Sequence, residues 1–331
     1  MRPDLKSFIQ LMSLPLLAAL LALFSTSVLS QAPVSLPVNI YGDGNPENGI
    51  EDSREQLMGG RGSGIGLATQ SLNAGSIMCD GKIRGTAMVL DTRELEPALE
   101  GVLLATAAHV LFDLERKRLF KRCEFHFLAL GELPRYRAKI DLGKARFGRY
   151  DPGSTTAGRE FGQGDWAYLY LARPWKNFNP AESIVPRDFN VLDMAAFERS
   201  HGEIRLVAFD STAGVIAVSR NCRVIESTAA DLGGGAWRGQ LLDDCDSAGG
   251  ASGGGIVAVV DNRQYLVGIR SGSHWSNEAF PADQYPLGPP DGSVWNPDFN
   301  TNFGRAIDSD LMRELIDFIQ EIKNTAASLD S

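Results

Sequence analysis

Hydrophobic residues occur along most of the chain in short runs that polar turns separate, which is the pattern of β-strands. Asp210-Ser211 and Asp261-Asn262 stand at the centres of two predicted hairpins. The pattern predicts strands at 83–90, 101–105, 125–130, 136–147, 166–171, 204–208, 214–218, 256–260 and 265–270. Many short strands without alternating helices predict an all-β protein, either a sandwich or a pair of barrels.

Helical spacing of apolar residues is seen near the C-terminus. Ser309 and Asp310 are residue types that cap a helix N-terminus, and apolar residues follow them at intervals of three and four. The predicted apolar side of this helix consists of Leu311, Leu315, Ile316, Phe318 and Ile319. We therefore expect one α-helix at the end of a β-protein.

Residues 1–30 have the features of a secretory signal peptide. Arg2 and Lys6 give a positive start, and a largely apolar stretch precedes small and polar residues that end at Ser30. We expect cleavage after Ser30 and export to a periplasm or out of the cell. The alternative is an uncleaved membrane anchor, which Pro15 and the short apolar core disfavour.

The segment 31–70 has little periodicity and is rich in Gly, Asn, Pro and charged residues. We interpret it as an N-terminal arm or a propeptide, and 71–331 as the folded domain. The formal net charge of −9, without a basic stripe, argues against nucleic acid as a partner. Four cysteines in an exported chain predict two disulfides, and no CxxC or HxxxH spacing indicates a metal site.

Ser252 stands in the glycine-rich stretch 249–255, directly ahead of an apolar run. A glycine-rich loop can turn sharply and point successive backbone N–H groups into one small space. Such donors form the oxyanion hole that stabilises the negative oxygen of acyl transfer. Ser252 is therefore a candidate nucleophile, and an ordinary Gly/Ser loop is the alternative.

A serine nucleophile requires a base, and the base requires a carboxylate that orients it. His109 ends a strand-like run and follows the small residues Thr106-Ala107-Ala108. Asp165 stands at the mouth of the predicted strand 166–171. Taken singly, a histidine at a strand end and a loop aspartate are usually structural, but together with Ser252 they supply all three roles.

The motifs TAAH at 106–109, GDWAYLYL at 164–171 and GGASGG at 249–254 occur in this order after a signal peptide. Over residues 77–324, about three quarters of the chain, the sequence resembles the trypsin/chymotrypsin family of serine peptidases. The resemblance implies a chymotrypsin-like double β-barrel with a C-terminal α-helix on the second barrel. It also implies that the two barrels divide near 185–200.

Residue by residue, the resemblance implies that His109 is the general base and then the acid, Asp165 orients it, and Ser252 is the nucleophile. The N–H groups of Gly250 and Ser252 would form the oxyanion hole. The substrate would be a protein or peptide, and no cofactor is implied.

The resemblance also suggests a substrate pocket. Asp246, six residues before Ser252, would lie with Ser247 at the base of the pocket and select Arg or Lys. Alternatively, Asp246 only forms hydrogen bonds within its loop. The strand that flanks the pocket and pairs with substrate backbone would be Ser271, Gly272 and Ser273. Nearby Arg270 and His274 are compatible with the opposite preference, for Glu or Asp, as in bacterial glutamyl endopeptidases.

Two features depart from the family pattern. Ala251 stands where trypsin-like enzymes carry the aspartate that receives the new N-terminus, and no Ile-Val-Gly-Gly start exists. The loop is therefore formed without that ion pair, or the arm plays another part. The implied disulfides are Cys222–Cys245 and Cys79–Cys123, and the other pairings stay open.

These observations favour an exported serine endopeptidase. The rival from another class is a catalytically silent binding protein that kept the barrels, with the arm in the cleft. An esterase of the same chemistry is a third interpretation. An α/β-hydrolase is disfavoured because its catalytic residues run in the order Ser, Asp, His.

Overall fold

Short β-strands dominate the structure, as the hydrophobic pattern predicts. The computed structural model describes residues 40–42, 53–56, 74–127, 136–150, 163–173, 178, 183–192, 197, 201–226, 239–286 and 288–329. The expected signal peptide lies outside these residues, as does most of the expected arm. Within the described part of the chain, no helix is long and apolar enough to cross a membrane.

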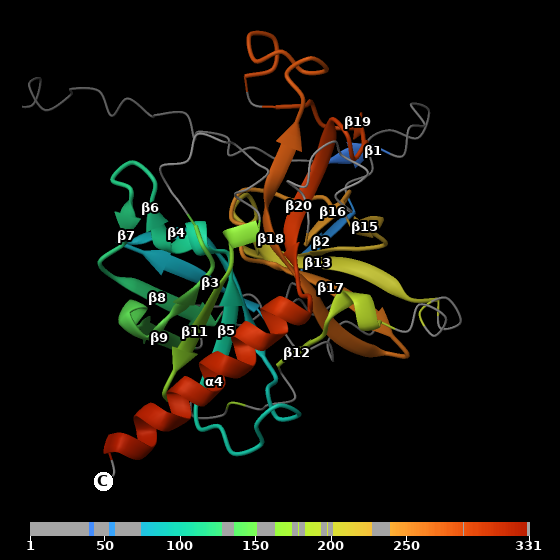
Figure 1. The fold of residues 1–331 in the computed structure, drawn as a ribbon. Coiled ribbons are helices and arrows are strands. Elements are labelled where there is room, and N and C mark those ends of the chain that lie inside the picture. Colours follow the sequence, from blue (N-terminus) through green and yellow to red (C-terminus); the bar gives the residue numbers. More distant parts are fainter. Residues whose placement is uncertain are drawn as a thin grey trace, which may run out of the picture. The chain divides into compact units, whose positions relative to one another are not determined.

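The first sheet is formed by seven antiparallel strands, cyan to green in Figure 1. In spatial order they are β10 (Arg146–Phe147), β11 (Ala167–Leu171), β5 (Val102–Thr106), β4 (Lys82–Leu90), β3 (Ala74–Cys79), β8 (Cys123–Phe127) and β9 (Tyr136–Ile140). Contacts between β9 and β11, which lie toward opposite edges, show that the sheet curls on itself. Its fully buried side chains include Ile77, Met88, Leu104, Phe125 and Leu169.

The second sheet has nine strands, and most of them belong to the yellow and orange part of the chain in Figure 1. In spatial order eight of them are β15 (Val224–Glu226), β16 (Gln240–Asp243), β20 (Asn300–Ala306), β18 (Arg263–Trp275), β17 (Gly255–Val260), β13 (Glu203–Asp210), β14 (Val215–Ser219) and β2 (Arg54–Gln56). The ninth, β12 (Val185–Pro186), pairs in parallel with β18. Its core includes Leu241, Ile256, Val257, Leu266 and Ile269.

The chain passes from the first sheet to the second at residues 184–186. Ile184 bridges to Leu90 of β4, and β12 then joins β18. β13 contacts both β3 and β4, so the sheets pack against each other. The all-β chymotrypsin-like double barrel with a C-terminal helix is thereby confirmed as the fold class. β2, from the segment expected to be an arm, is part of the second sheet.

Smaller elements complete the described fold. Two short pairs are β1 (Tyr41–Gly42) with β19 (Ser293–Val294), and β6 (Phe112–Asp113) with β7 (Arg118–Leu119). The 3₁₀ turns are η2 (Ala108–Leu111), η3 (Leu142–Lys144) and η5 (Phe189–Val191). The expected strand 136–147 is two strands, because Asp141 accepts the Gly143 N–H and starts η3.

The C-terminal helix, α4 (Ser309–Leu329), differs from the expectation in two respects. Its N-terminus is capped by Asp308, whose Oδ1 accepts the Leu311 N–H, and not by Ser309 or Asp310. Ile316 is 48% exposed, since it lies about 140° around the helix from buried Leu311. The Tyr168 hydroxyl donates to the Leu311 carbonyl, so the helix also contacts the first sheet.

Both implied disulfides are present. Cys79–Cys123 joins neighbouring strands β3 and β8 of the first sheet. Cys222–Cys245 joins the chain after β14 to the chain after β16, a few residues ahead of Ser252.

Candidate active site

His109 and Asp165 lie at the same end of two neighbouring strands. His109 is in η2, three residues after β5, and Asp165 is two residues before β11. These strands pair antiparallel, with Ala167 opposite Thr106. The end of one strand and the start of the other therefore meet at one edge, which brings the imidazole and the carboxylate together.

The Asp165 carboxylate holds His109 at two points. One oxygen lies 2.8 Å from the His109 backbone nitrogen and accepts its N–H, and the other lies 2.7 Å from Nδ1. The Asp165 side chain is completely buried, whereas that of His109 is 15% exposed. This pair leaves Nε2 as the ring nitrogen that can face a reacting group.

The loop that carries Ser252 packs against the turn of His109. A methyl group built on Gly253 would lie 3.0 Å from the Ala107 nitrogen and would clash with Thr106 Oγ1 and the Thr86 carbonyl. Gly253 also has φ of +79°, so glycine is required here on two grounds. The loop can therefore pack directly against Ala107, which is two positions before His109 in the sequence. The described contacts include no hydrogen bond between Ser252 and His109, and such bonds often tighten only with substrate.

Two N–H groups of the loop are left without acceptors in the described structure. The N–H groups of Ala251, Gly253 and Gly254 donate to backbone carbonyls. Those of Gly250 and Ser252 donate to no described residue. These are the two donors that the resemblance assigns to an oxyanion hole.

Thr86 of β4 connects the first sheet to this loop, a role that the sequence did not reveal. Its N–H donates to the Ser252 carbonyl at 2.7 Å, and its hydroxyl donates to the Gly250 carbonyl at 2.8 Å. The same hydroxyl oxygen accepts the Phe209 N–H from β13. The neighbouring Gly85 lies just as close to the loop, because a side chain there would lie 2.5 Å from the Ser252 carbonyl.

The residues expected to flank a substrate are on β18. β17 pairs with β18 as far as Ile269, and beyond it Ser271–Ser273 lie next to β20 on one side only. On the side away from β20 they pair with no other described strand, and Arg270, directly ahead of them, exchanges backbone hydrogen bonds with Gly253 and Gly254 of the Ser252 loop. Ser273 donates to Asn302, and the buried Ser271 hydroxyl has no partner in the described structure.

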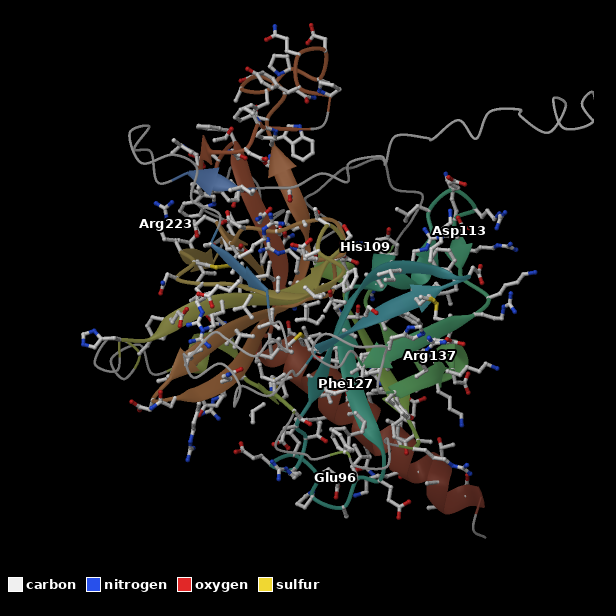
Figure 2. The ribbon with its side chains drawn as sticks, turned by 180° about the vertical axis from the view of Figure 1, so that it is seen from behind. Glu96, His109, Asp113, Phe127, Arg137 and Arg223 are labelled. Atoms are coloured by element: carbon white, nitrogen blue, oxygen red, sulfur yellow. A yellow bond between two sulfur atoms is a disulfide. The ribbon has the colours of Figure 1, made fainter. Side chains whose placement is uncertain are left out.

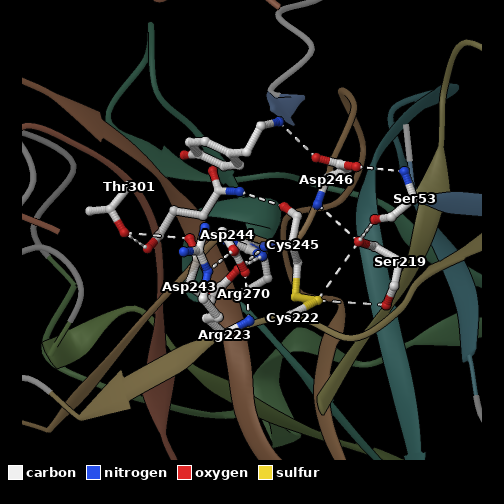
Figure 3. The surroundings of a disulfide bond; sticks show 12 residues. Ser53, Ser219, Cys222, Arg223, Asp243, Asp244, Cys245, Asp246, Arg270 and Thr301 are labelled. Carbon is white, nitrogen blue, oxygen red and sulfur yellow. Dashed lines mark hydrogen bonds and ion pairs between the residues drawn. A yellow bond between two sulfur atoms is a disulfide. The ribbon is translucent and has the colours of Figure 1, made fainter. Parts of the chain in front are cut away.

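Asp246 is buried and engaged by the N-terminal segment. Figure 3 shows it next to Cys245 of the disulfide, with hydrogen bonds to Ser53 and Ser219. Its two carboxylate oxygens accept the N–H groups of Tyr41 at 2.8 Å and of Ser53 at 2.7 Å. Its own N–H donates to Ser219 Oγ. Neighbouring Ser247 is also buried. The carboxylate expected to receive a basic substrate side chain is thus bound to this chain's own backbone.

Arg270 and Asp243 form an ion pair in the core of the second sheet, 2.6 Å apart. Both side chains are almost fully buried, and burial raises the pKa of Asp243 while Arg270 opposes that shift. Burial also raises the pKa of the Tyr41 phenol, and the Asp243 carboxylate adds to the effect. The backbone of Arg270 exchanges hydrogen bonds with Gly253 and Gly254. The charge of Arg270 is therefore balanced by Asp243. The sequence alone did not indicate this ion pair.

Among the described residues, the other three histidines lie apart from His109 and Asp165 and take part in other contacts or turns. His126 contacts Glu124, and His201 lies in a turn. His274 pairs with Thr301 in the β18–β20 ladder. No group of three metal-ligating side chains occurs among the described residues. Figure 2 shows His109 toward the second sheet, whereas Asp113 and Arg137 lie on the outer parts of the first sheet.

No protein-family model matches the chain, and no curated protein matches it. Among solved structures, the crystal structure of the protease Anisep from Arthrobacter nicotinovorans is similar, with a TM-score of 0.46 and 10% identity. The match covers 76% of this chain and 97% of that chain. A proposal for this chain therefore rests on its own side chains.

Proposed function

We propose that the protein is a serine endopeptidase in which His109, Asp165 and Ser252 act together. The observation that carries this proposal is the two-point hydrogen bonding of His109 by the fully buried Asp165, at the turn on which the Ser252 loop packs. A buried carboxylate on Nδ1 holds the imidazole in the tautomer whose Nε2 accepts a proton.

In the proposed reaction, Ser252 Oγ attacks the scissile carbonyl carbon while His109 Nε2 takes the hydroxyl proton. The carbonyl π electrons move to oxygen, and the oxyanion is stabilised by the N–H groups of Gly250 and Ser252. The tetrahedral intermediate collapses as His109 gives its proton to the leaving amine, which leaves an acyl-enzyme. Water, deprotonated by His109, then hydrolyses the ester. Asp165 stays ionised and stabilises the imidazolium.

Preference for Arg or Lys next to the scissile bond stays a prediction that depends on Asp246. Both of its oxygens already accept N–H groups, so a basic side chain would have to replace Tyr41 or Ser53 there. The acid-preferring alternative requires Arg270 to exchange Asp243 for a substrate carboxylate. A panel of peptides with Lys, Arg, Glu, Asp and Phe before the scissile bond separates these cases.

We further propose that the protein acts after export. Two disulfides are expected of a chain that folds in an oxidising compartment, and both pairs here are formed. The predicted signal peptide supports the same conclusion.

The deciding experiment labels the exported protein with a fluorophosphonate and maps the adduct by peptide mass. We expect the adduct on Ser252, its loss in His109→Ala, and a fall in peptide hydrolysis on the order of 10⁶ in Ser252→Ala. Ser309→Ala is the control, since this exposed serine at the start of α4 has no part in the proposed site.

An adduct on another residue, or hydrolysis that survives in Ser252→Ala, would refute the proposal. Correctly folded protein without any adduct would favour the silent binding protein. Hydrolysis of esters without hydrolysis of peptides would identify an esterase of the same chemistry.

A further inference from the structure

The N-terminal strand β2 lies against the support of the nucleophile loop. It pairs antiparallel with β14 at the edge of the second sheet, with Arg54 opposite Ser219 and Gln56 opposite Ala217. Ser53, directly ahead of it, donates its N–H to Asp246 and shares a hydroxyl hydrogen bond with Ser219. The start of the nucleophile loop is therefore bound to a segment about two hundred positions earlier in the chain.

Arg54 extends from β2 to the turn between β13 and β14. Its Nη1 lies 3.1 Å from Asp210 Oδ2, and the two side chains are only 14% and 8% exposed. The other Asp210 oxygen accepts the N–H groups of Thr212 and Ala213, which closes the turn. A charge-assisted contact with this little water around it is stronger than a surface ion pair. Arg54 thus holds the carboxylate on which the turn is built.

The turn between β13 and β14 also contacts the nucleophile loop, residues 249–254. The N–H of Ser211, next to Asp210, donates to the Gly249 carbonyl at 2.9 Å. In a trans peptide, the carbonyl and the N–H of the next residue point in opposite directions. The Gly249 carbonyl and the Gly250 N–H belong to one peptide. The hydrogen bond from Ser211 therefore sets the direction of a proposed oxyanion donor.

The side chain next to the nucleophile offers no competing anchor. Ala251 has no polar group, yet it lines the same small cavity as Arg54, Asp210, Ser219 and Asp246. Charge in this cavity comes from the β2 segment and from Asp210 and Asp246, and not from the residue before Ser252. The cationic side chain that lines this cavity is Arg54.

We propose that Arg54 is a positioning residue that, through Asp210 and Ser211, keeps the Gly250 N–H directed at the oxyanion. This inference rests on the proposed function. If Arg54 has this role, Ser53–Gln56 must remain in the active protein. Any propeptide that is removed would then have to end ahead of Ser53. The loop then takes its active form without the ion pair to a newly formed N-terminus that the trypsin-like pattern uses.

The test compares Arg54→Gln with Arg54→Lys in the full exported chain. Arg54→Gln should lower kcat by about tenfold to a hundredfold with little change in KM, because loss of one oxyanion donor costs about 10² to 10³. Affinity for a peptide boronate, which forms the tetrahedral adduct, should fall by the same factor. Arg54→Lys keeps the cation and should recover most of the loss.

Arg220→Gln is the matched control. Arg220 follows β14 and pairs with Glu55 of β2 at 3.1 Å, so it joins the same two strands. It has no described contact with the turn of Asp210 or with the nucleophile loop. Arg220→Gln should lower the unfolding temperature at most slightly and leave kcat unchanged.

Hydrogen exchange at residues 244–254 provides a readout that needs no activity. Exchange should become faster in Arg54→Gln and stay unchanged in Arg220→Gln. Unchanged exchange, an unchanged kcat in Arg54→Gln, or an active species that begins after Gln56 would overturn the inference. If wild-type protein forms no adduct while the exchange still changes, the proposed function fails but the connection from Arg54 to the loop stands.

Discussion

The two halves of the candidate site are built in different ways. His109 follows β5 and Asp165 precedes β11, so the register of two adjacent strands of one sheet sets the hydrogen bonds between them. The Ser252 loop is held by groups from several parts of the chain: Thr86 of the first sheet, Arg270 of β18, Ser211 of a hairpin turn and Ser53 of the N-terminal segment.

This difference has a physical consequence. A pair set by the register of two neighbouring strands forms whenever that sheet forms. A loop whose orientation depends on distant partners shifts when any of them is lost. Substitutions far from Ser252 are therefore expected to change catalysis, whereas distant substitutions in the first sheet should mainly change stability.

The largest effect on activity should come from Asp165, in the half of the site that is built on the first sheet. Asp165→Asn should reduce kcat by a factor on the order of 10⁴, because an amide favours the wrong imidazole tautomer. The fold should persist, since the asparagine oxygen can still accept the His109 N–H. Measurement of kcat together with the unfolding temperature checks this, and an active Asp165→Asn enzyme would show that Asp165 is not the orienting group.

The next effect should come from the loop itself. Gly253→Ala should lower kcat at least on the order of 10², because the new methyl group clashes with Thr86 and Thr106 and moves the oxyanion donors. Gly81→Ala is the control: Gly81 has the same φ of +79°, but its methyl group would meet nothing within 4 Å. If both variants lose activity equally, backbone strain and not the close approach is responsible.

The smallest effect on activity should come from the disulfides, and it should differ between the halves. Replacing Cys79 and Cys123 by alanine should lower the free energy of unfolding by about 4 kcal/mol, and replacing Cys222 and Cys245 by about 3 kcal/mol, because the closed loops span 44 and 23 residues.

Activity should rank in the opposite order, since Cys245 is next to Asp246 and the nucleophile loop. We expect a few-fold loss of kcat without Cys222–Cys245 and little loss without Cys79–Cys123. Denaturant unfolding and kinetics on the two double variants test this ranking. Equal kinetic losses would argue against the contrast between the halves.

Much of the fold followed from the sequence. Alternating apolar residues indicated most strands, and polar turn residues marked two hairpins, because local backbone preferences and burial of one face act over a few positions. The errors lay where a tertiary partner decides. Asp308 caps α4 because Arg305 holds its carboxylate, and Ile316 faces solvent because the first sheet meets another side of the helix.

For the site, sequence by itself supplied the candidate chemistry: a histidine at a strand end, an aspartate before a strand and a serine among glycines. Together these residue types supply a base, an orienting acid and a nucleophile, and their order along the chain can be read without the fold. Only tertiary structure decided that Asp246 binds the N–H groups of Tyr41 and Ser53, and that Arg54 pairs with Asp210. Such partners are chosen by proximity in space, and separations of about 150 to 200 positions leave no periodic signal in the chain.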